Sequence, residues 1–196
     1  MLPAPGAHLD SIANGAYACG VIWTVTEVRL MIAQRSRRTG ASPQDRGSLA
    51  MIVVPAIAAI AYAGLDVWLH PYLPIPLGFR ALGFPVFVAG LALRQWSIAV
   101  LGRFFTVDVA IHGEHRLIEE GPYRLLRHPS YTGFAMILLG IGLMVGKPMT
   151  LALVLLAPLP GLIRRIQVEE QALRQAFGAS FDAYAKRTWR LMPGVF

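Results

Sequence analysis

Apolar residues fill five stretches of the chain, and polar residues gather between and after them. The stretches are 12–33, 49–69, 77–101, 131–146 and 149–163. The first three have about the length that an α-helix needs to cross a membrane. The last two are about fifteen residues each and are joined by Lys147 and Pro148, which predicts a tight helical hairpin near the lower limit for crossing. We therefore expect an all-α, multi-pass integral membrane protein with about five transmembrane helices.

The polar segments predict how the rest of the chain is organised. Residues 34–48 form a basic loop, and residues 102–130 are too polar to span a membrane. After Arg164 the chain is polar and is expected to be helical up to Phe177, to stop at Gly178 and to begin a new helix with Ser180 as its N-cap. We expect one domain over 1–196, with three spans in 1–101 and the remaining elements in 102–196.

The charges of the loops predict the orientation. The loop after the first stretch holds Arg35, Arg37, Arg38 and Arg46. The loops at 70–76 and 147–148 together hold a single lysine. Because basic loops stay on the cytoplasmic side, five spans put the N-terminus outside and the C-terminus in the cytoplasm, at the inner membrane if the cell is bacterial. Residues 102–130 and the C-terminal part then lie on one membrane face.

Composition narrows the class of protein. Of 196 residues, 55% are hydrophobic and the mean hydropathy is +0.52, more than the core of a small soluble domain can absorb. The net charge of +7 comes from sixteen arginines and two lysines, which loop charge explains better than nucleic-acid binding. The single cysteine, Cys19, excludes an internal disulfide and a cysteine-based metal site. The first ten residues lack a basic region, so we expect no cleavable signal peptide.

The stretch 121–133, GPYRLLRHPSYTG, is the most promising candidate for chemistry. It places a histidine, arginines and two tyrosines between hydrophobic segments. Pro129 disfavours the α conformation at His128, so the stretch is predicted to be a structured loop that ends where an apolar helix begins near Tyr131. A polar, ring-rich loop at the mouth of a membrane helix is a plausible small-molecule site.

This stretch also resembles a known signature. With His115-Arg116-Leu117-Ile118 before it, and Glu169-Glu170-x-x-Leu173 followed by Phe177-Gly178 after it, the chain is similar to the isoprenylcysteine carboxyl methyltransferase family and its bacterial relatives over roughly 90–193. The resemblance implies S-adenosylmethionine as cofactor. It implies that the residues contacting this cofactor are His115, Arg116, Leu117, Ile118, Tyr123, His128, Pro129, Ser130, Tyr131 and Glu169.

Arg165 and Glu169 are four residues apart and share one helix face. Such a pair taken alone is more often a solvated salt bridge. By resemblance, Glu169 holds the cofactor and Arg165 faces the carboxylate of the substrate as the catalytic residue. A carboxylate suits ribose hydroxyls, and a guanidinium suits a carboxylate. Arg94, inside the third apolar stretch, and Arg190 are further substrate-binding candidates, as is Arg103, although lipid binding or helix capping explains Arg103 and Arg190 equally well.

The expected activity is therefore methyl transfer to a lipophilic or small acceptor, most plausibly a carboxylate, at the cytosolic membrane face. Phospholipid or amine N-methylation and thiol S-methylation share the architecture, and a sterol-reductase-like enzyme is a more distant alternative. A structural or regulatory membrane protein is the non-enzyme alternative. Expected partners are the methyl acceptor and membrane lipids, with no obligate protein partner. Gly140, Gly142 and Gly146 lie in an apolar helix, where close packing explains them better than nucleotide binding.

Overall fold

The computed structural model describes residues 11–33, 48–69, 75–102 and 116–194, and these residues are helical with short connections. The helices are α1 (Ser11–Ala33), α2 (Ser48–Leu69), α3 (Leu77–Ala81), α4 (Gly83–Leu101), the 3₁₀ helix η3 (Gly121–Arg124), α5 (Pro129–Val145), α6 (Pro148–Leu156), α7 (Leu159–Phe177) and α8 (Ala179–Arg187). No strand forms within these ranges, and Leu126 and Trp189 make an isolated parallel bridge. The all-α prediction is confirmed for the part of the chain that is described.

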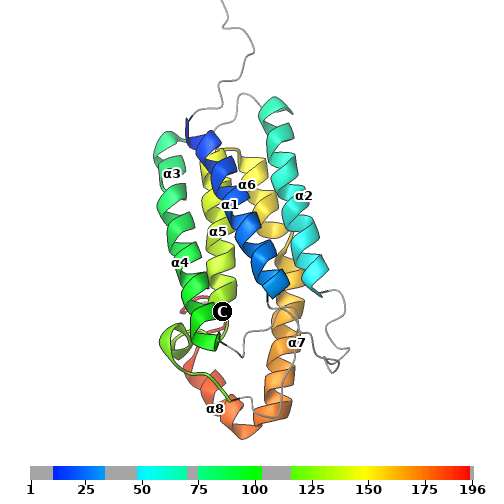
Figure 1. Cartoon of the computed structure of the whole chain (residues 1–196), viewed down its shortest axis with the longest axis vertical. Helices are drawn as coiled ribbons and strands as arrows, with labels where there is room; N and C mark the ends of the chain where they lie inside the picture. Colours follow the sequence, from blue (N-terminus) through cyan, green and yellow to red (C-terminus); the bar gives the residue numbers. More distant parts are fainter. Residues whose placement is uncertain (1–10, 34–47, 70–74, 103–115, 195–196) are drawn as a thin grey trace, which may run out of the picture.

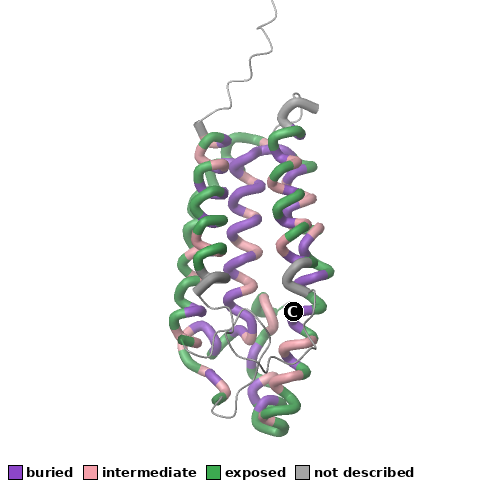
Figure 2. Tube along the Cα trace, turned by 45° about the vertical axis from the view of Figure 1, so that its right-hand side comes forward, coloured by how far each residue is buried: buried purple, intermediate pink, exposed green. Residues whose placement is uncertain are grey.

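Helix α5 is the centre of an elongated bundle. In Figure 1, α1, α2, α4, α5 and α6 run along the long axis, while α7 continues beyond them and α8 turns back beneath. Figure 2 shows burial concentrated along the middle of the bundle and exposure on its outer faces. The most buried side chains of α5 include Ile137 and Leu138, with exposed fractions of 0% and 1%. The core cluster therefore forms around the helix that begins immediately after His128.

Glycines allow α4 to approach α5 closely. A Cβ added to Gly140 would lie 2.6 Å from the carbonyl oxygen of Gly83 and 2.7 Å from the backbone nitrogen of Phe87. One added to Gly133 would lie 2.7 Å from the carbonyl oxygen of Gly90. Backbone-to-backbone contact of this kind needs small residues at the interface. The packing explanation for Gly140 is confirmed.

The predicted spans agree with the helices in position but not in every boundary. Two stretches, Leu77–Leu101 and Pro148–Phe177, are long and apolar enough to cross a membrane among the described residues. The first is interrupted at Leu82, between α3 and α4. The second is interrupted at residues 157–158, between α6 and α7, so the predicted stretch 149–163 is divided between two helices.

Proline explains the second boundary. Pro158 and Pro160 stand at the start of α7, where the missing N–H groups cost nothing, and α7 then carries an apolar half and a polar half as one helix. Ser180 is not an N-cap, because α8 begins at Ala179 and Gly178 occupies the cap position with φ of 51°. The number of spans and the orientation of the termini remain predictions.

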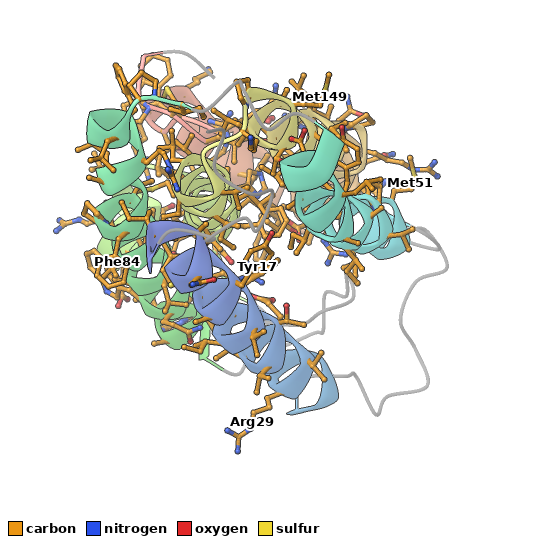
Figure 3. All side chains as sticks on the ribbon, turned by 90° about the horizontal axis from the view of Figure 1, so that it is seen from above. Tyr17, Arg29, Met51, Phe84 and Met149 are labelled. Atoms are coloured by element: carbon orange, nitrogen blue, oxygen red, sulfur yellow. The ribbon has the colours of Figure 1, made fainter. Side chains whose placement is uncertain are left out.

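Charged residues within the apolar helices have polar partners or project outward. Asp66, 1% exposed in α2, accepts hydrogen bonds from the backbone N–H and the hydroxyl of Thr150, at 2.9 and 2.7 Å. Arg80 donates to the carbonyl oxygen of Met144. Arg29, near the end of α1, projects away from the bundle in Figure 3. Such pairing is what an ionisable group needs when it is removed from water.

Candidate functional site

The start of α5 is built around His128 and Pro129. Pro129 occupies the first helical position, where its fixed φ suits the helix and its missing N–H is not needed. His128 has φ of −126° and ψ of 55°, outside the helical region, as expected for a residue before proline. Its carbonyl oxygen accepts from the backbone N–H groups of Tyr131 and Thr132, at 3.0 and 3.1 Å. The predicted loop-to-helix transition is confirmed, two residues before Tyr131.

His128 lies between two consecutive glutamates of α7. Its Nδ1 is 3.3 Å from Glu169 Oε2, and its Nε2 is 3.5 Å from Glu170 Oε1. Burial alone would lower the pKa of His128, but the hydrogen bonds and negative charges of Glu169 and Glu170 outweigh it and raise the pKa above its usual value. In the imidazolium form both ring nitrogens carry a proton, and each of them lies on the side of one carboxylate.

Tyr131 and Arg165 contact the other carboxylate oxygen of Glu169. The hydroxyl of Tyr131 donates to Glu169 Oε1 at 2.5 Å, and Arg165 Nε donates to the same hydroxyl oxygen at 2.7 Å. Arg165 Nε is also 3.6 Å from Glu169 Oε1. The rings of His128 and Tyr131 stack with centroids 5.6 Å apart. Four residues predicted as site residues therefore form one connected cluster.

Accessibility distinguishes the members of this cluster. Arg165 is 4% exposed, whereas the side chain of Glu169 is 25% exposed. Glu169 is thus held by Tyr131 and His128 while part of it still reaches the surface of the cluster. Such a carboxylate is available to a hydroxyl-bearing ligand.

Glu170 has a different set of partners. It accepts from Arg127 Nε at 2.9 Å and from Arg190 Nη2 at 3.0 Å. Its side chain is 6% exposed. Sequence reasoning assigned no role to Arg127 or Glu170, although each is adjacent to a predicted site residue. Arg190, predicted to bind substrate, is engaged with Glu170, and its role toward an acceptor remains a prediction.

The C-terminal segment closes over the loop before α5. The backbone N–H groups of Arg127 and His128 donate to the carbonyl oxygens of Trp189 and Arg190, at 2.7 and 3.0 Å. The N–H of Trp189 donates to Leu125 in return, at 2.9 Å. Segments 125–128 and 188–191 therefore run side by side, and α7, α8 and the segment after them enclose the site.

The predicted cofactor residues before His128 are buried to different extents or lie outside the described ranges. Tyr123 is buried against α4, with its hydroxyl 3.4 Å from the carbonyl oxygen of Ser97. Ile118 is buried, Leu117 half-buried and Arg116 exposed. His115 and Arg103 lie outside the described residues. No cluster of three metal-ligating side chains occurs in the described ranges.

Arg94 lies beside the cluster. Its Nη1 donates to the carbonyl oxygen and the hydroxyl of Ser130, at 3.2 and 2.9 Å. Its other nitrogens form an ion pair with Glu27 of α1. Both oxygens of Ser130 are therefore turned toward Arg94, and a contact between Ser130 and the cofactor remains a prediction.

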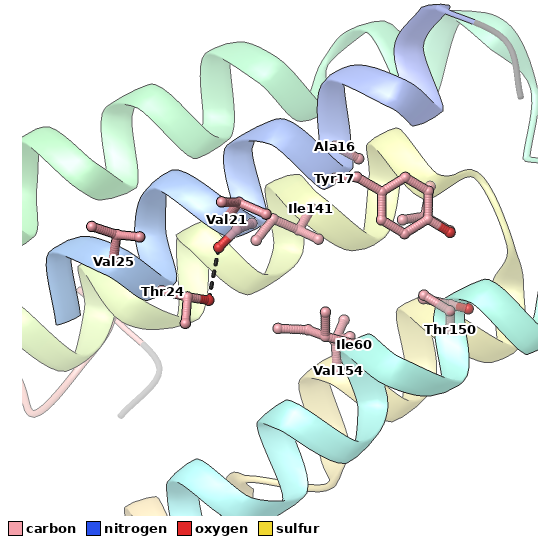
Figure 4. A pocket seen from close by; sticks show the side chains of 12 residues that line it. Ala16, Tyr17, Val21, Thr24, Val25, Ile60, Ile141, Thr150 and Val154 are labelled. Atoms are coloured by element: carbon pink, nitrogen blue, oxygen red, sulfur yellow. Dashed lines mark hydrogen bonds between the residues drawn. The ribbon is translucent and has the colours of Figure 1, made fainter. Parts of the chain in front are cut away.

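An apolar cavity of about 260 Å³ lies within the bundle between α1, α2, α5 and α6. Figure 4 shows Val21, Ile60 and Ile141 around it, with Tyr17 and Thr150 toward one end and Thr24 and Val25 toward the other. The hydroxyl of Thr24 donates to the carbonyl oxygen of Gly20, so it adds little polarity to the wall. The cavity suits a hydrocarbon group.

Comparisons with known proteins agree with this geometry. Residues 81–175 match the model of the isoprenylcysteine carboxyl methyltransferase family. The probable protein-S-isoprenylcysteine O-methyltransferase of Oryza sativa subsp. indica is 34% identical over 116 residues, which are 58% of this chain and 61% of that protein. Protein-S-isoprenylcysteine O-methyltransferase B of Arabidopsis thaliana is 35% identical over 115 residues, 58% of each chain. The matches thus span about six tenths of these relatives.

A solved structure shares the fold. The eukaryotic intramembrane Ras methyltransferase ICMT superposes with a TM-score of 0.74 at 21% identity, over 98% of this chain and 70% of that one. The helical bundle of this chain therefore shares the fold of that solved structure. Segment 81–175, nearly half of the chain, is similar to the isoprenylcysteine carboxyl methyltransferase family, as the resemblance in its sequence implied.

Proposed function

We propose that the protein is an integral membrane methyltransferase that uses S-adenosylmethionine to methylate the carboxylate of a lipophilic acceptor of the isoprenylcysteine type. The observation that carries this proposal is the cluster of His128, Tyr131, Arg165 and Glu169. It joins the loop before α5 to the polar half of α7. The match of residues 81–175 to the methyltransferase family model and the apolar cavity add support.

The residues present fit the cofactor. Glu169 offers a carboxylate that is held in place yet 25% exposed, which suits the hydroxyls of a ribose. The stacked rings of His128 and Tyr131 provide an aromatic wall, and Tyr131 can present a π face to a cation. When bound, S-adenosylmethionine supplies an electrophilic methyl group on a sulfonium sulfur. The aromatic and acidic residues of the cluster suit both its charge and its hydroxyls.

Arg165 is proposed to bind the carboxylate of the acceptor. A carboxylate is already ionised at neutral pH and needs no general base, so catalysis consists of positioning and the exclusion of water. Arg165 Nε donates to Tyr131, and the planar shape of a guanidinium suits the two oxygens of an acceptor carboxylate. The buried position of Arg165 strengthens that attraction because few water molecules screen it.

The acceptor class follows from charge and from the cavity. A protonated amine would be repelled by Arg165, which makes amine N-methylation the weaker alternative. A thiol gains nothing from a guanidinium fork until it is ionised. The apolar cavity lies within the membrane-facing part of the bundle and is proposed to take hydrocarbon of the acceptor, entering laterally between helices.

Calorimetry with S-adenosylhomocysteine on the purified protein in detergent tests the proposal. Binding that is lost in Glu169→Ala, with the melting temperature of the variant preserved, is the expected result. A folded wild-type protein that does not bind S-adenosylhomocysteine would support the structural or regulatory alternative instead. If binding is observed, methyl transfer to a prenylated cysteine, compared with an amine and a thiol of equal chain length, decides the acceptor.

A further inference from the structure

Glu27 of α1 and Arg94 of α4 form a two-pronged ion pair beside the first turn of α5. Arg94 Nε pairs with one carboxylate oxygen of Glu27, and Arg94 Nη2 donates to the other at 2.6 Å. Trp23 Nε1 donates to the first oxygen at 3.0 Å. The side chains of Arg94 and Glu27 are 11% and 16% exposed. The guanidinium and the carboxylate are thus fixed in one plane and largely removed from water.

The third nitrogen of Arg94 reaches α5. Nη1 donates to the hydroxyl and the carbonyl oxygen of Ser130, the second residue of that helix. Ser130 stands between His128 and Tyr131, two members of the site cluster. A single guanidinium therefore connects α1 to the turn that carries these two side chains.

The backbone of Arg94 has little freedom to adjust. A Cβ added to Gly133 would lie 2.8 Å from the backbone nitrogen of Arg94 and 2.9 Å from its Cβ. Helix α4 is thus in direct contact with α5 at the level of Arg94. The side chain begins at a fixed point, is held by Glu27 and ends on Ser130, so its position determines that of the turn.

Stability alone gives a poor account of this pair. A buried ion pair seldom stabilises a fold more than well-packed apolar residues in its place, because removing two charges from water costs several kcal/mol per ion. A pair that only joined α1 to α4 would also need no bond to Ser130. The directional bonds end at the first turn of α5, which is where the site begins.

We propose that Glu27 is a positioning residue of the site, acting through Arg94 on Ser130 and thereby on His128 and Tyr131. This inference rests on the proposed function for its claim that the turn borders the cofactor. Because Glu27 neutralises Arg94, the acceptor carboxylate is left to Arg165. The first helix, which lies outside residues 81–175, thus contributes to the site without touching a ligand.

A charge exchange separates positioning from simple helix pairing. Glu27→Gln breaks the pair, and the double variant Glu27→Arg/Arg94→Glu restores opposite charges with reversed polarity. A glutamate at position 94 can accept from the hydroxyl of Ser130 but cannot donate to its carbonyl oxygen. Asp182→Asn is the matched control, since Asp182 of α8 pairs with Arg174 of α7 in an ion pair that is 52–54% exposed.

Three quantities are measured for each variant: the melting temperature, the affinity for S-adenosylhomocysteine and the hydrogen exchange of amides 130–134. Glu27→Gln is expected to weaken affinity about tenfold and to speed exchange in this segment. The exchanged pair is expected to recover melting temperature but neither affinity nor slow exchange. The control should change none of the three.

Recovery of all three quantities in the exchanged pair would overturn the proposal, because opposite charges alone would then suffice. An unchanged exchange rate and affinity in folded Glu27→Gln would overturn it as well. If the wild-type protein does not bind S-adenosylhomocysteine, the proposed function fails. The exchange rates would still decide whether Glu27 fixes the first turn of α5.

Discussion

Tyr131 Oη lies 2.5 Å from Glu169 Oε1, although 38 positions separate the two residues in the sequence. This bond joins the start of α5 to the polar half of α7. The next residue of α7, Glu170, projects from a different side of the helix. Both glutamates lie beside His128, but Glu169 also faces Tyr131, whereas Glu170 also faces Arg127 and Arg190. Consecutive glutamates are thus expected to have separate roles.

Glu169→Gln and Glu170→Gln should therefore differ in kind. Glu169→Gln removes a charged acceptor from Tyr131 and His128 and should weaken S-adenosylhomocysteine binding about tenfold or more, with a small change in melting temperature. Glu170→Gln leaves Arg127 without its carboxylate and should mainly destabilise the fold, by about 3 kcal/mol. Calorimetry and thermal unfolding in detergent measure the two effects. Equal losses of affinity and stability in both variants would show that the glutamates share one role.

The charge state of His128 should make stability depend on pH. Because Glu169 and Glu170 raise the pKa of His128 above its usual value, the stabilisation is fully present below about pH 6.5 and is lost as the pH rises through the raised value. Arg127 and Arg190 also contact Glu170, and Arg165 lies beside Glu169, so each carboxylate faces a guanidinium as well as His128.

Melting temperatures measured from about pH 5.5 to 9 test this expectation. The wild-type protein should lose stability on the alkaline side. His128→Gln, which has no proton to lose, should show a flatter profile there and lower stability at acidic pH. An alkaline slope that is the same in both proteins would assign it to another group.

The boundaries of the fold were predictable to different degrees. Each apolar stretch was located because hydrophobic composition is a local property, and every described α-helix overlaps a predicted one, whereas the 3₁₀ helix η3 lies in a predicted loop. The break at Leu82 and the bend before α7 were missed. Pro158 and Pro160 are visible in the sequence, but whether prolines end a helix or begin the next depends on how the two helices pack.

The site was predictable where the family resemblance reached, and less so elsewhere. Arg165, Glu169, His128 and Tyr131 were all identified, and they meet. Glu27 was not, because its partner Arg94 is 67 positions away and two different apolar helices must pack before the pair exists. Glu170 was missed for a simpler reason, since adjacent acidic residues on a helix cannot be told apart until their neighbours are known.

Close packing between α4 and α5 gives a test of the fold itself. In Gly140→Ala the new methyl group would lie within 2.6–2.8 Å of the backbone of Gly83 and Phe87, so the helices must move apart. Overpacking of this kind costs about 1–3 kcal/mol. Gly20→Ala is the control, because nothing lies within 4 Å of its added Cβ and alanine favours the helix by up to about 1 kcal/mol. Both are measured by unfolding in detergent, and an unperturbed Gly140→Ala would contradict the observed approach of the helices.

The topology predicted from loop charges is tested separately. Reporter fusions at Arg38 and Phe196 should report the cytoplasmic side, and a fusion at Lys147 the opposite side. The reason is the concentration of arginine in segment 34–48 and after α7. Arg38 and Phe196 on opposite faces would exclude five spans and would separate the basic loop from the site.

Arg165 provides the sharpest test of the assigned chemistry, because a salt bridge and an acceptor ligand predict different results. If Arg165 only paired with Glu169, removing either residue should cause similar small losses, about 0.2–0.5 kcal/mol for an exposed helical pair. Arg165 is instead 4% exposed and donates to Tyr131. Arg165→Ala should therefore leave S-adenosylhomocysteine affinity nearly intact and lower turnover or acceptor affinity.

Arg165→Lys should restore little of the lost turnover or acceptor affinity, because lysine keeps the charge and loses the planar fork. Separate titrations of cofactor and acceptor on Arg165→Ala and Glu169→Ala measure the difference. Matching losses of both ligands in both variants would remove Arg165 from its assigned role.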